Sequence, residues 1–290
     1  MFYFTDILNY TFWAFVILIA LMSACIVKIS YLFYWYELAT IQPKLIKVRF
    51  RPARLKKAIA LLASEFMATY VSWLLYPIGW LPISTLCLRK QPSQTIVLLH
   101  GLFQNRACCF WLQLRLALHG HRVITLTMPP WKQVESLSEQ LDQTISRLRQ
   151  NKNIQRIDLI SHSMGGIIAR NYIQRRGGAA NIRTCITLGT PHSGSKMSSL
   201  AFTKLARTLI PNNTLLNQLN QKKWPENLPF TAIYSVTDNL VLPTDSGHCS
   251  KANNIIIPLC GHMLLLYHPA VFNHLLVALN PTIDGLAKTG

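Results

Sequence analysis

The sequence predicts an α/β fold, with a mostly parallel sheet that carries helices on both faces, preceded by an apolar helical region. From Thr95 onward, short β-rich runs alternate with helical stretches, which is typical of a parallel sheet covered by helices. Half of the 290 residues are apolar, and most of the apolar surplus lies before residue 90. A chain of this length holds one large domain plus extra segments.

Three parts follow from this division. Residues 1–57 are expected to form a transmembrane anchor and a basic juxtamembrane loop, and residues 58–90 a second apolar, membrane-associated helix. Residues 91–290 form the domain that contains the sheet.

The stretch 7–27 carries no charged residue. At 1.5 Å per residue it is long enough to cross a hydrocarbon core of about 30 Å. Aromatic residues at both ends are typical of membrane interfaces; they are Phe2, Tyr3, Phe4, Tyr10, Trp13, Tyr31, Phe33, Tyr34, Trp35 and Tyr36. The acidic start at Asp6 and the length of the run favour a retained anchor over a cleaved signal peptide. The protein is therefore expected at the cell membrane.

The segment Lys44–Lys57 contains seven basic residues and no acidic residue. The positive-inside rule places it on the cytoplasmic side, and such a segment also binds anionic headgroups. A solvated linker that only sets the topology explains the charges equally well. The net charge of +18 suits an anionic partner. Because no nucleic-acid-binding motif is visible, we expect an anionic lipid surface and no nucleic acid.

Residues 58–88 are apolar, with Glu65 as the single charge. Glu65, Thr69, Ser72 and Tyr76 recur at helical spacing and form one polar stripe. If this helix lies in the membrane interface, the chain crosses once and the sheet domain is cytoplasmic. If the helix crosses the membrane, the domain lies outside. The stripe favours the interfacial arrangement.

The expected elements of the sheet domain alternate regularly. The strands are 95–99, 122–126, 156–160, 183–189, 230–236 and 253–259, and the helices are 106–119, 134–150 and 164–176. Two short helices are expected within 195–229. They form either a mobile cap over a site or a fixed excursion that closes the core, and the sequence allows both. The seven cysteines fit no disulfide or metal pattern and are expected to be mostly buried thiols.

Ser163 lies between the strand 156–160 and the helix that begins at Met164. This strand–turn–helix context is the one that a nucleophile elbow requires, and the sharp turn needs small neighbours. Gly165 meets that need, while Ser161 stands where the pattern usually has Gly. A serine that only caps the helix is the alternative interpretation.

A nucleophilic serine needs a base and an acid that orients the base. Asp238 and His262 follow the last two predicted strands, and both belong at the carboxyl edge of the sheet. Asp245 and His268 are their rivals. The backbone N–H groups of Met164 and Leu102 are the expected oxyanion donors.

Three further histidines lie near these motifs. We expect His100 to brace the oxyanion loop, the side chain of His162 to point away from the reacting bond, and His192 to be structural. The remaining histidines form no metal-ligand pattern, so no metal site is predicted.

Five segments in this order and spacing resemble the bacterial lipase/esterase family of the α/β-hydrolase superfamily, including membrane-anchored members and lipases related to GPI-inositol deacylases. They are HGLFQN, SHSMGG, TLGTPHSG, YSVTDNLVLP and GHMLLLYHP, within residues 94–275. The resemblance implies an α/β-hydrolase fold over 91–290 and hydrolysis of carboxylic esters without a cofactor. It also implies that the substrates are acyl glycerols or phospholipids.

We therefore expect a membrane-anchored serine hydrolase that cleaves acyl esters of lipids, with Ser163 as nucleophile, His262 as base and Asp238 as its partner. An acyltransferase or thioesterase with the same triad and a non-catalytic membrane scaffold of the same fold are the alternatives. No sequence feature specifies an oligomeric state.

Overall fold

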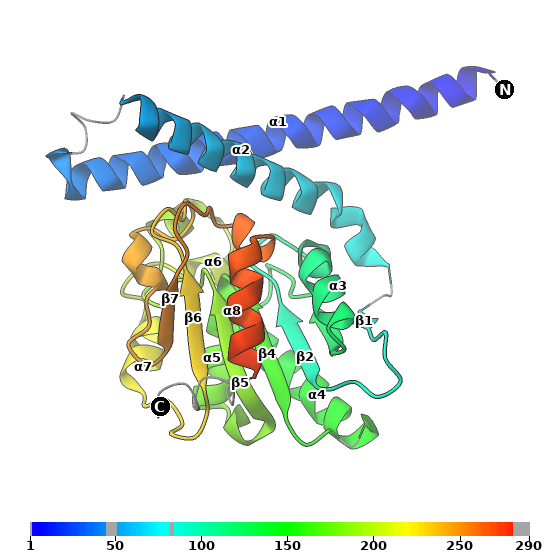
Figure 1. The fold of residues 1–290 in the computed structure, drawn as a ribbon, viewed down its shortest axis with the longest axis vertical. Coiled ribbons are helices and arrows are strands. Elements are labelled where there is room, and N and C mark those ends of the chain that lie inside the picture. Colours follow the sequence, from blue (N-terminus) through cyan, green and yellow to red (C-terminus); the bar gives the residue numbers. More distant parts are fainter. Residues whose placement is uncertain (1, 45–50, 82–83, 153, 281–290) are drawn as a thin grey trace, which may run out of the picture.

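The computed structural model describes residues 2–44, 51–81, 84–152 and 154–280. Within these residues the core is a seven-stranded sheet with the strand order β1-β3-β2-β4-β5-β6-β7. Two long helices, α1 and α2, cross one end of the sheet domain (Figure 1). This confirms the prediction of a mostly parallel sheet preceded by a long apolar helix.

The six predicted strands all form, with ends that shift by at most three residues. They are β2 (Thr95–Leu99), β3 (Arg122–Leu126), β4 (Ile157–His162), β5 (Ile182–Leu188), β6 (Phe230–Tyr234) and β7 (Asn253–Ile256). All neighbouring pairs among them are parallel. The unpredicted strand β1 (Thr85–Leu86) runs antiparallel to β3 at the edge, and a two-residue strand has no periodicity that sequence reading can detect.

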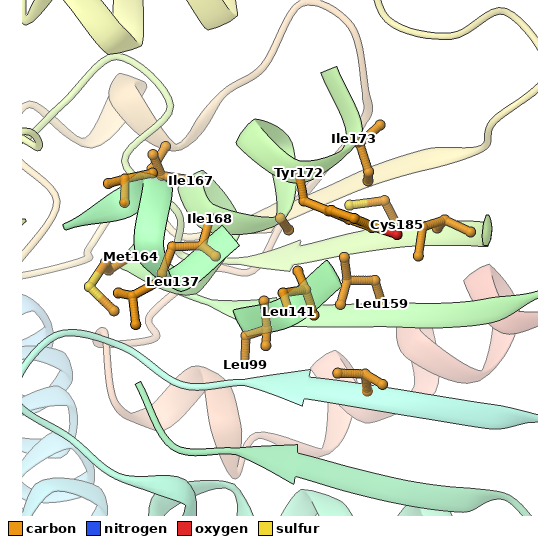
Figure 2. Close-up of a cluster of buried hydrophobic side chains, with 14 of the residues drawn as sticks. Leu99, Leu137, Leu141, Leu159, Met164, Ile167, Ile168, Tyr172, Ile173 and Cys185 are labelled. Atoms are coloured by element: carbon orange, nitrogen blue, oxygen red, sulfur yellow. The ribbon is translucent and has the colours of Figure 1, made fainter. Parts of the chain in front are cut away.

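Helices cover both faces of the sheet. Side chains alternate along each strand, so Ile96 and Leu98 lie in one apolar cluster while Val97 and Leu99 lie in the other. The first face is covered by α3 (Phe110–Leu118), which follows the 3₁₀ turn η3 (Arg106–Cys109), and by α8 (Pro269–Leu279). The second is covered by α4 (Val134–Lys152) and α5 (Met164–Arg175). Figure 2 shows Leu137 and Leu141 of α4 packed with residues of α5 and the strands.

The stretch 195–229 forms the 3₁₀ turn η5 (Lys196–Leu200) and two short helices, α6 (Lys204–Arg207) and α7 (Thr214–Gln221). Leucines of α6, α7 and the connecting loop are buried in the second cluster; they are Leu205, Leu209, Leu216 and Leu219. Side chains of α5 also hold this stretch, because Arg170 and Gln174 both donate to the carbonyl of Leu219. These contacts favour the fixed excursion for α6 and α7.

Helix α1 (Phe2–Ile41) is long and apolar, and within the described residues its part Asp6–Ile41 is the single stretch that meets the length and hydropathy needed to cross a membrane. A helix of 40 residues measures about 60 Å, about twice the thickness of a hydrocarbon core. Its first half exposes many large apolar side chains: Ile7, Leu8, Tyr10, Phe12, Trp13, Phe15, Ile17, Leu18 and Leu21.

The second half of α1 lies against the rest of the protein. Val27 and Tyr31 pack on Leu61 of α2 (Pro52–Leu74). Tyr31 and Tyr34 donate hydrogen bonds to the carbonyls of Thr237 and Val236. These two tyrosines, which we assigned to an aromatic belt, thus use their hydroxyls to hold the loop after β6.

Helix α2 begins within the segment that we assigned to the basic loop, of which residues 45–50 lie outside the described part. It ends at Leu74 and is followed by the 3₁₀ turn η2 (Tyr76–Trp80). Its polar stripe is buried against the sheet domain: Glu65 and Ser72 are completely buried and Thr69 is 3% exposed. The stripe therefore marks the face that contacts the domain, because buried polar groups need hydrogen-bond partners and the domain supplies them.

Five of the seven cysteines are buried, as expected, while Cys25 is exposed and Cys87 is partly exposed. The sulfur atoms of the adjacent residues Cys108 and Cys109 lie 3.8 Å apart, much farther than in a disulfide.

Candidate active site

Ser163 occupies a sharp turn between β4 and α5. Its backbone has φ 55° and ψ −125°, a conformation that costs a non-glycine residue about 1–3 kcal/mol. The turn is held on both sides, because the N–H of Ser163 donates to the carbonyl of Leu188 at 2.8 Å and the Thr190 hydroxyl donates to the carbonyl of Ser163 at 2.9 Å. The surrounding structure thus maintains a strained residue at the carboxyl edge of the sheet.

Small residues surround this turn. A Cβ atom on Gly165 would lie 2.9 Å from the carbonyl oxygen of His100, and one on Gly166 would overlap the side chain of Thr190. Ser161 is completely buried at the end of β4, and within the described residues its hydroxyl has no hydrogen-bond partner. The turn therefore forms with Ser in place of the usual Gly at this position.

The loops after β6 and β7 bring Asp238 and His262 together. Nδ1 of His262 lies 2.7 Å from Oδ2 of Asp238, and both side chains are almost fully buried. Oδ1 of Asp238 accepts hydrogen bonds from the N–H groups of Leu240 and Val241, at 2.8 and 2.9 Å. The rival acid Asp245 lies in another turn, η6 (Thr244–Gly247), and the rival base His268 caps α8 by accepting from the N–H of Ala270.

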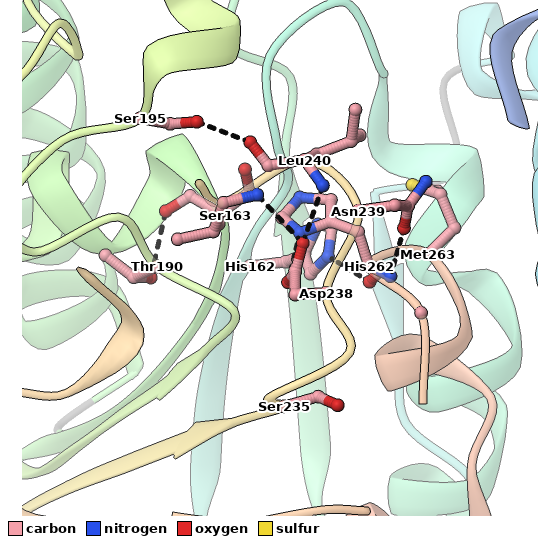
Figure 3. Close-up of polar contacts among 12 residues, drawn as sticks. His162, Ser163, Thr190, Ser195, Ser235, Asp238, Asn239, Leu240, His262 and Met263 are labelled. Carbon is pink, nitrogen blue, oxygen red and sulfur yellow. Dashed lines mark hydrogen bonds and ion pairs between the residues drawn. The ribbon is translucent and has the colours of Figure 1, made fainter. Parts of the chain in front are cut away.

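The environment of His262 favours its charged form. Burial is the largest single effect and lowers its pKa, but the charge and the hydrogen bond of Asp238, together with the charge of Glu65, outweigh burial and the net shift of the pKa is upward. Gly189 leaves room for this pair, because a Cβ atom there would lie 3.2 Å from Oδ2 of Asp238 and 3.3 Å from Nδ1 of His262. Figure 3 shows the pair beside Ser163.

The loop after β2 approaches Ser163 closely. A Cβ atom on Gly101 would lie 3.0 Å from Cβ and 3.5 Å from Oγ of Ser163. Leu102 follows and lines the same cavity as Ser163, and Phe103 takes the positive φ of 58° that turns the loop. Met164 is the first residue of α5, where backbone N–H groups have no partner within the helix. Both expected oxyanion donors thus belong to backbone segments adjoining Ser163.

His100 braces this loop, as expected. Its Nε2 accepts a hydrogen bond from the N–H of Met128 at 2.8 Å, which leaves Nδ1 to donate to the carbonyl of Gly101 at 2.8 Å. Burial lowers the pKa of His100 to about 4. A neutral ring with both nitrogens engaged is a structural support.

His162 differs from expectation. Its ring lines the cavity with Ser163, and its centroid lies 4.7 Å from that of the His262 ring. Its Nε2 lies 3.1 Å from the carbonyl of His262, and donation there holds the loop of the base. The only sign in the sequence that His162 could belong to the site was its position next to Ser163. The orientation of its side chain could not be predicted, because it depends on the backbone at the end of β4. His192, by contrast, is buried between Arg170 and Thr187, which agrees with a structural role.

A cavity of about 500 Å³ contains Ser163 and His262. Its floor is the carboxyl edge of the sheet, and apolar residues of η5 and the following loop, Leu200 and Phe202, lie on its wall. Helices α1 and α2 contribute Ile26, Glu65, Thr69 and Trp73. The long helices thus form part of the site, which the sequence did not indicate.

Glu65 and Asn239 are site residues that sequence reading missed. Glu65 accepts from the N–H groups of Met263 and Leu264, and Asn239 accepts from the N–H of His262. Glu65 was visible as an isolated charge in an apolar helix, but its partner lies almost 200 positions away. Over the described ranges no cluster of three or more His, Cys, Asp or Glu side chains has the arrangement of a metal site.

A family model described as palmitoyl protein thioesterase matches residues 95–238. The fold is similar to that of mature lipase BlEst2 from Bacillus licheniformis, with a TM-score of 0.60 and 15% identity over 66% of this chain and 95% of that one. The chain therefore has the α/β-hydrolase fold, and over residues 95–238 its sequence is similar to the palmitoyl protein thioesterase family.

Two further relatives extend this comparison. Lipase B of Aspergillus fumigatus has a TM-score of 0.56 and 17% identity over 62% of this chain and 50% of that chain. GPI inositol-deacylase of Candida albicans is 30% identical over 122 residues, which are 42% of this chain and 26% of the fungal protein. The chain therefore spans about a quarter of that relative's length.

Proposed function

We propose that this α/β-hydrolase is a serine carboxylic-ester hydrolase that cleaves acyl esters of lipids. The observation that carries the proposal is that Ser163, with its strained backbone, lines the same cavity as His262, and that the buried His262 is paired with Asp238. Strain at one nucleophilic residue beside a paired imidazole is a frequent property of catalytic centres. Its relationship to lipases and thioesterases supports the same class of reaction.

In the proposed mechanism, Oγ of Ser163 attacks the ester carbonyl while Nε2 of His262 takes the hydroxyl proton. Asp238 accepts the hydrogen bond from Nδ1, which fixes the tautomer and stabilises the imidazolium. The N–H groups of Leu102 and Met164 bind the oxyanion. His262 then protonates the leaving alcohol, and a water molecule activated by the same imidazole releases the acid and regenerates Ser163.

A lipid substrate is supported by the cavity. Most of its lining is apolar, and α1 and α2 contribute Ile26 and Trp73. Leu200 and Phe202, which also line it, are 53% and 95% exposed. An acyl chain entering from a bilayer would meet these side chains first and would remain out of water between the membrane and Ser163.

The membrane arrangement that we propose has one crossing, by the first half of α1. In this proposal residues 1–57 anchor and orient the chain, the helix within 58–90 lies on the sheet domain, and residues 91–290 form the catalytic domain. The basic segment Lys44–Lys57 then lies on the same side as that domain. The positive-inside rule makes this side cytoplasmic, with the basic residues near anionic headgroups.

The test of the proposed function uses purified, detergent-solubilised protein. We expect Ser163→Ala to lower the hydrolysis of p-nitrophenyl butyrate and p-nitrophenyl palmitate by about 10⁴-fold or more, since a nucleophile acts in every turnover. A serine-directed fluorophosphonate should label the wild type and not the variant. A folded wild type that hydrolyses no faster than Ser163→Ala and resists labelling would contradict the proposal and favour the scaffold alternative.

A thioesterase is the second candidate, favoured by the family model that matches residues 95–238. The same triad would attack a thioester, and His262 would protonate a thiolate in place of an alkoxide. Comparing the kcat/KM for palmitoyl-CoA and p-nitrophenyl palmitate separates the two candidates. An acyltransferase would instead raise product formation when an alcohol acceptor is added to the assay.

A further inference from the structure

A buried carboxylate of α2 lies against the turn that carries the proposed base. Oε1 of Glu65 accepts a hydrogen bond from the N–H of Met263 at 2.8 Å, and Oε2 accepts one from the N–H of Leu264 at 2.9 Å. These are the two residues directly after His262, at the start of the 3₁₀ turn η7 (Leu264–Leu266). The side chain of Glu65 is completely buried, so both oxygens are committed to this turn.

The approach of this carboxylate depends on Gly261. A Cβ atom at Gly261 would overlap Oε2 and Cδ of Glu65. The residue before His262 is therefore glycine because the Glu65 side chain of α2 occupies the space that a Cβ atom would need. Burying a carboxylate costs free energy that an apolar side chain would not cost, so simple packing of α2 does not account for Glu65.

A second brace reaches the same turn from α1. Oδ1 of Asn239 accepts from the N–H of His262 at 3.0 Å, and Nδ2 of Asn239 donates to the Ser30 hydroxyl at 2.7 Å. The backbone N–H groups of three consecutive residues, 262–264, are therefore held by side-chain oxygens, and both braces involve the N-terminal helices.

We propose that Glu65 is a positioning residue of this site, whose carboxylate fixes the backbone that presents His262 and makes α2 part of the catalytic apparatus. The inference rests on the proposed function, because it assigns Glu65 to the base of that reaction. It does not assign Glu65 contact with the substrate.

The charge of Glu65 also acts on the base. The titratable groups around it are His262 and Asp238 from the two catalytic loops, Tyr31 from α1 and Cys260 from the loop after β7. Burial raises the pKa of Glu65 to about 7, although its two backbone hydrogen bonds oppose the shift. Beyond the larger effects of burial and Asp238, Glu65 is one of the groups that raise the pKa of His262.

The experiment compares Glu65→Gln, Glu65→Asp and a control in the full-length, detergent-solubilised protein. Glutamine keeps the shape but replaces one acceptor by a donor that faces an N–H group. We expect kcat for p-nitrophenyl butyrate to fall by about 10- to 100-fold with little change in KM, as for a catalytic group displaced by a fraction of an ångström. The acid limb of the pH profile should move to lower pH, because the wild-type Glu65, which is partly ionised near its pKa of about 7, is an anionic neighbour of His262 that the variant lacks. Aspartate keeps the charge but is too short, so kcat should fall while the acid limb stays in place.

Ser72→Ala is the matched control. Ser72 is also a buried polar residue of α2, and its hydroxyl lies 2.7 Å from that of Tyr267 in the sheet domain. Losing this contact should leave kcat within about threefold and the acid limb unchanged, since a neutral hydrogen bond contributes about 1 kcal/mol to stability. Melting temperatures verify that each variant is folded.

The outcomes are distinguishable from those of the proposed function. If the wild type is neither active nor labelled by the fluorophosphonate, the proposed function itself is wrong. If the wild type is active and folded Glu65→Gln keeps its kcat and pH profile, only the role of Glu65 is overturned. Equal losses in Glu65→Gln and Ser72→Ala without a shift of the acid limb would also overturn it, in favour of simple docking of α2. Should Glu65→Gln fail to fold, a folded Glu65→Asp with wild-type kcat overturns it.

Discussion

At the residue scale, the protonation state of His262 decides when the proposed reaction runs. The Asp238 carboxylate shifts the pKa of His262 upward against the effect of burial. The base must be neutral to accept the proton of Ser163, so activity should rise with pH through the pKa of His262. We expect the acid limb of kcat/KM for p-nitrophenyl butyrate to have its midpoint above 6.5, the ordinary value. A profile between pH 5 and 9 measures it, and a midpoint below 6.5 in stable protein would contradict the assignment.

Ser161 allows a test of the elbow. Its hydroxyl is buried and has no partner among the described residues, and an unsatisfied buried hydroxyl destabilises the native state. We expect Ser161→Ala to keep activity and to raise the free energy of unfolding by about 1 kcal/mol, or the melting temperature by about 2–4 °C. Ser138→Ala serves as the contrast, since that buried hydroxyl bonds both Ile168 and Asn171 and its loss should be destabilising. A Ser161→Ala variant that is less stable than the wild type would mean that the hydroxyl has a partner in solution.

At the element scale, the stretch 195–229 divides into a packed part and an exposed part. Helices α6 and α7 are fixed by buried leucines and by Arg170. The loop that follows η5, in contrast, exposes 95% of Phe202 at the cavity. The two predicted helices are confirmed, and in the proposed function this loop is the part of the stretch that contacts lipid.

Phe202→Ser should therefore affect long-chain substrates selectively. Full burial of a phenylalanine side chain is worth about 1.5–3 kcal/mol, so we expect the ratio of palmitate to butyrate hydrolysis to fall by about tenfold in lipid–detergent mixtures. Trp131→Ser is the control, because Trp131 is 75% exposed and is not among the described residues that line the cavity. An unchanged ratio in Phe202→Ser, or an equal fall in both variants, would contradict this role of the loop.

At the scale of the whole molecule, the contacts of α2 constrain the membrane topology. Glu65 and Ser72 bind the sheet domain, so in the single-crossing arrangement that we propose, the basic segment before α2 and the domain after it share one side of the membrane. In bacterial cells we expect a C-terminal green fluorescent protein fusion to fluoresce and a C-terminal alkaline phosphatase fusion to be inactive. Replacing the seven basic residues of 44–57 with serine should weaken this preference. An active phosphatase fusion to the unaltered chain would place the domain outside.

Local patterns were enough to predict the sheet domain. Strands such as 95–99 and 122–126 were predicted to the residue, because buried parallel strands appear as short apolar runs between turns. The proposed triad could be chosen because Ser163, Asp238 and His262 each follow a predicted strand, and parallel strands deliver such residues to one edge. Three features could not be predicted from the sequence: the presence of strand β1, the orientation of the His162 side chain and the surface that the polar stripe of α2 contacts. Each of them depends on a partner that is distant in the chain.

The sequence by itself therefore determined the mostly parallel α/β sheet, the apolar first helix and the candidates for the proposed triad, because periodicity and strand ends are local properties. Tertiary structure alone decided that α1 and α2 form part of the site, that Asp238 and not Asp245 pairs with His262, and that Glu65 is a buried partner of the backbone at Met263 and Leu264. An isolated carboxylate in an apolar helix can face water, lipid headgroups or protein. Only packing supplies the two N–H groups that make its burial tolerable.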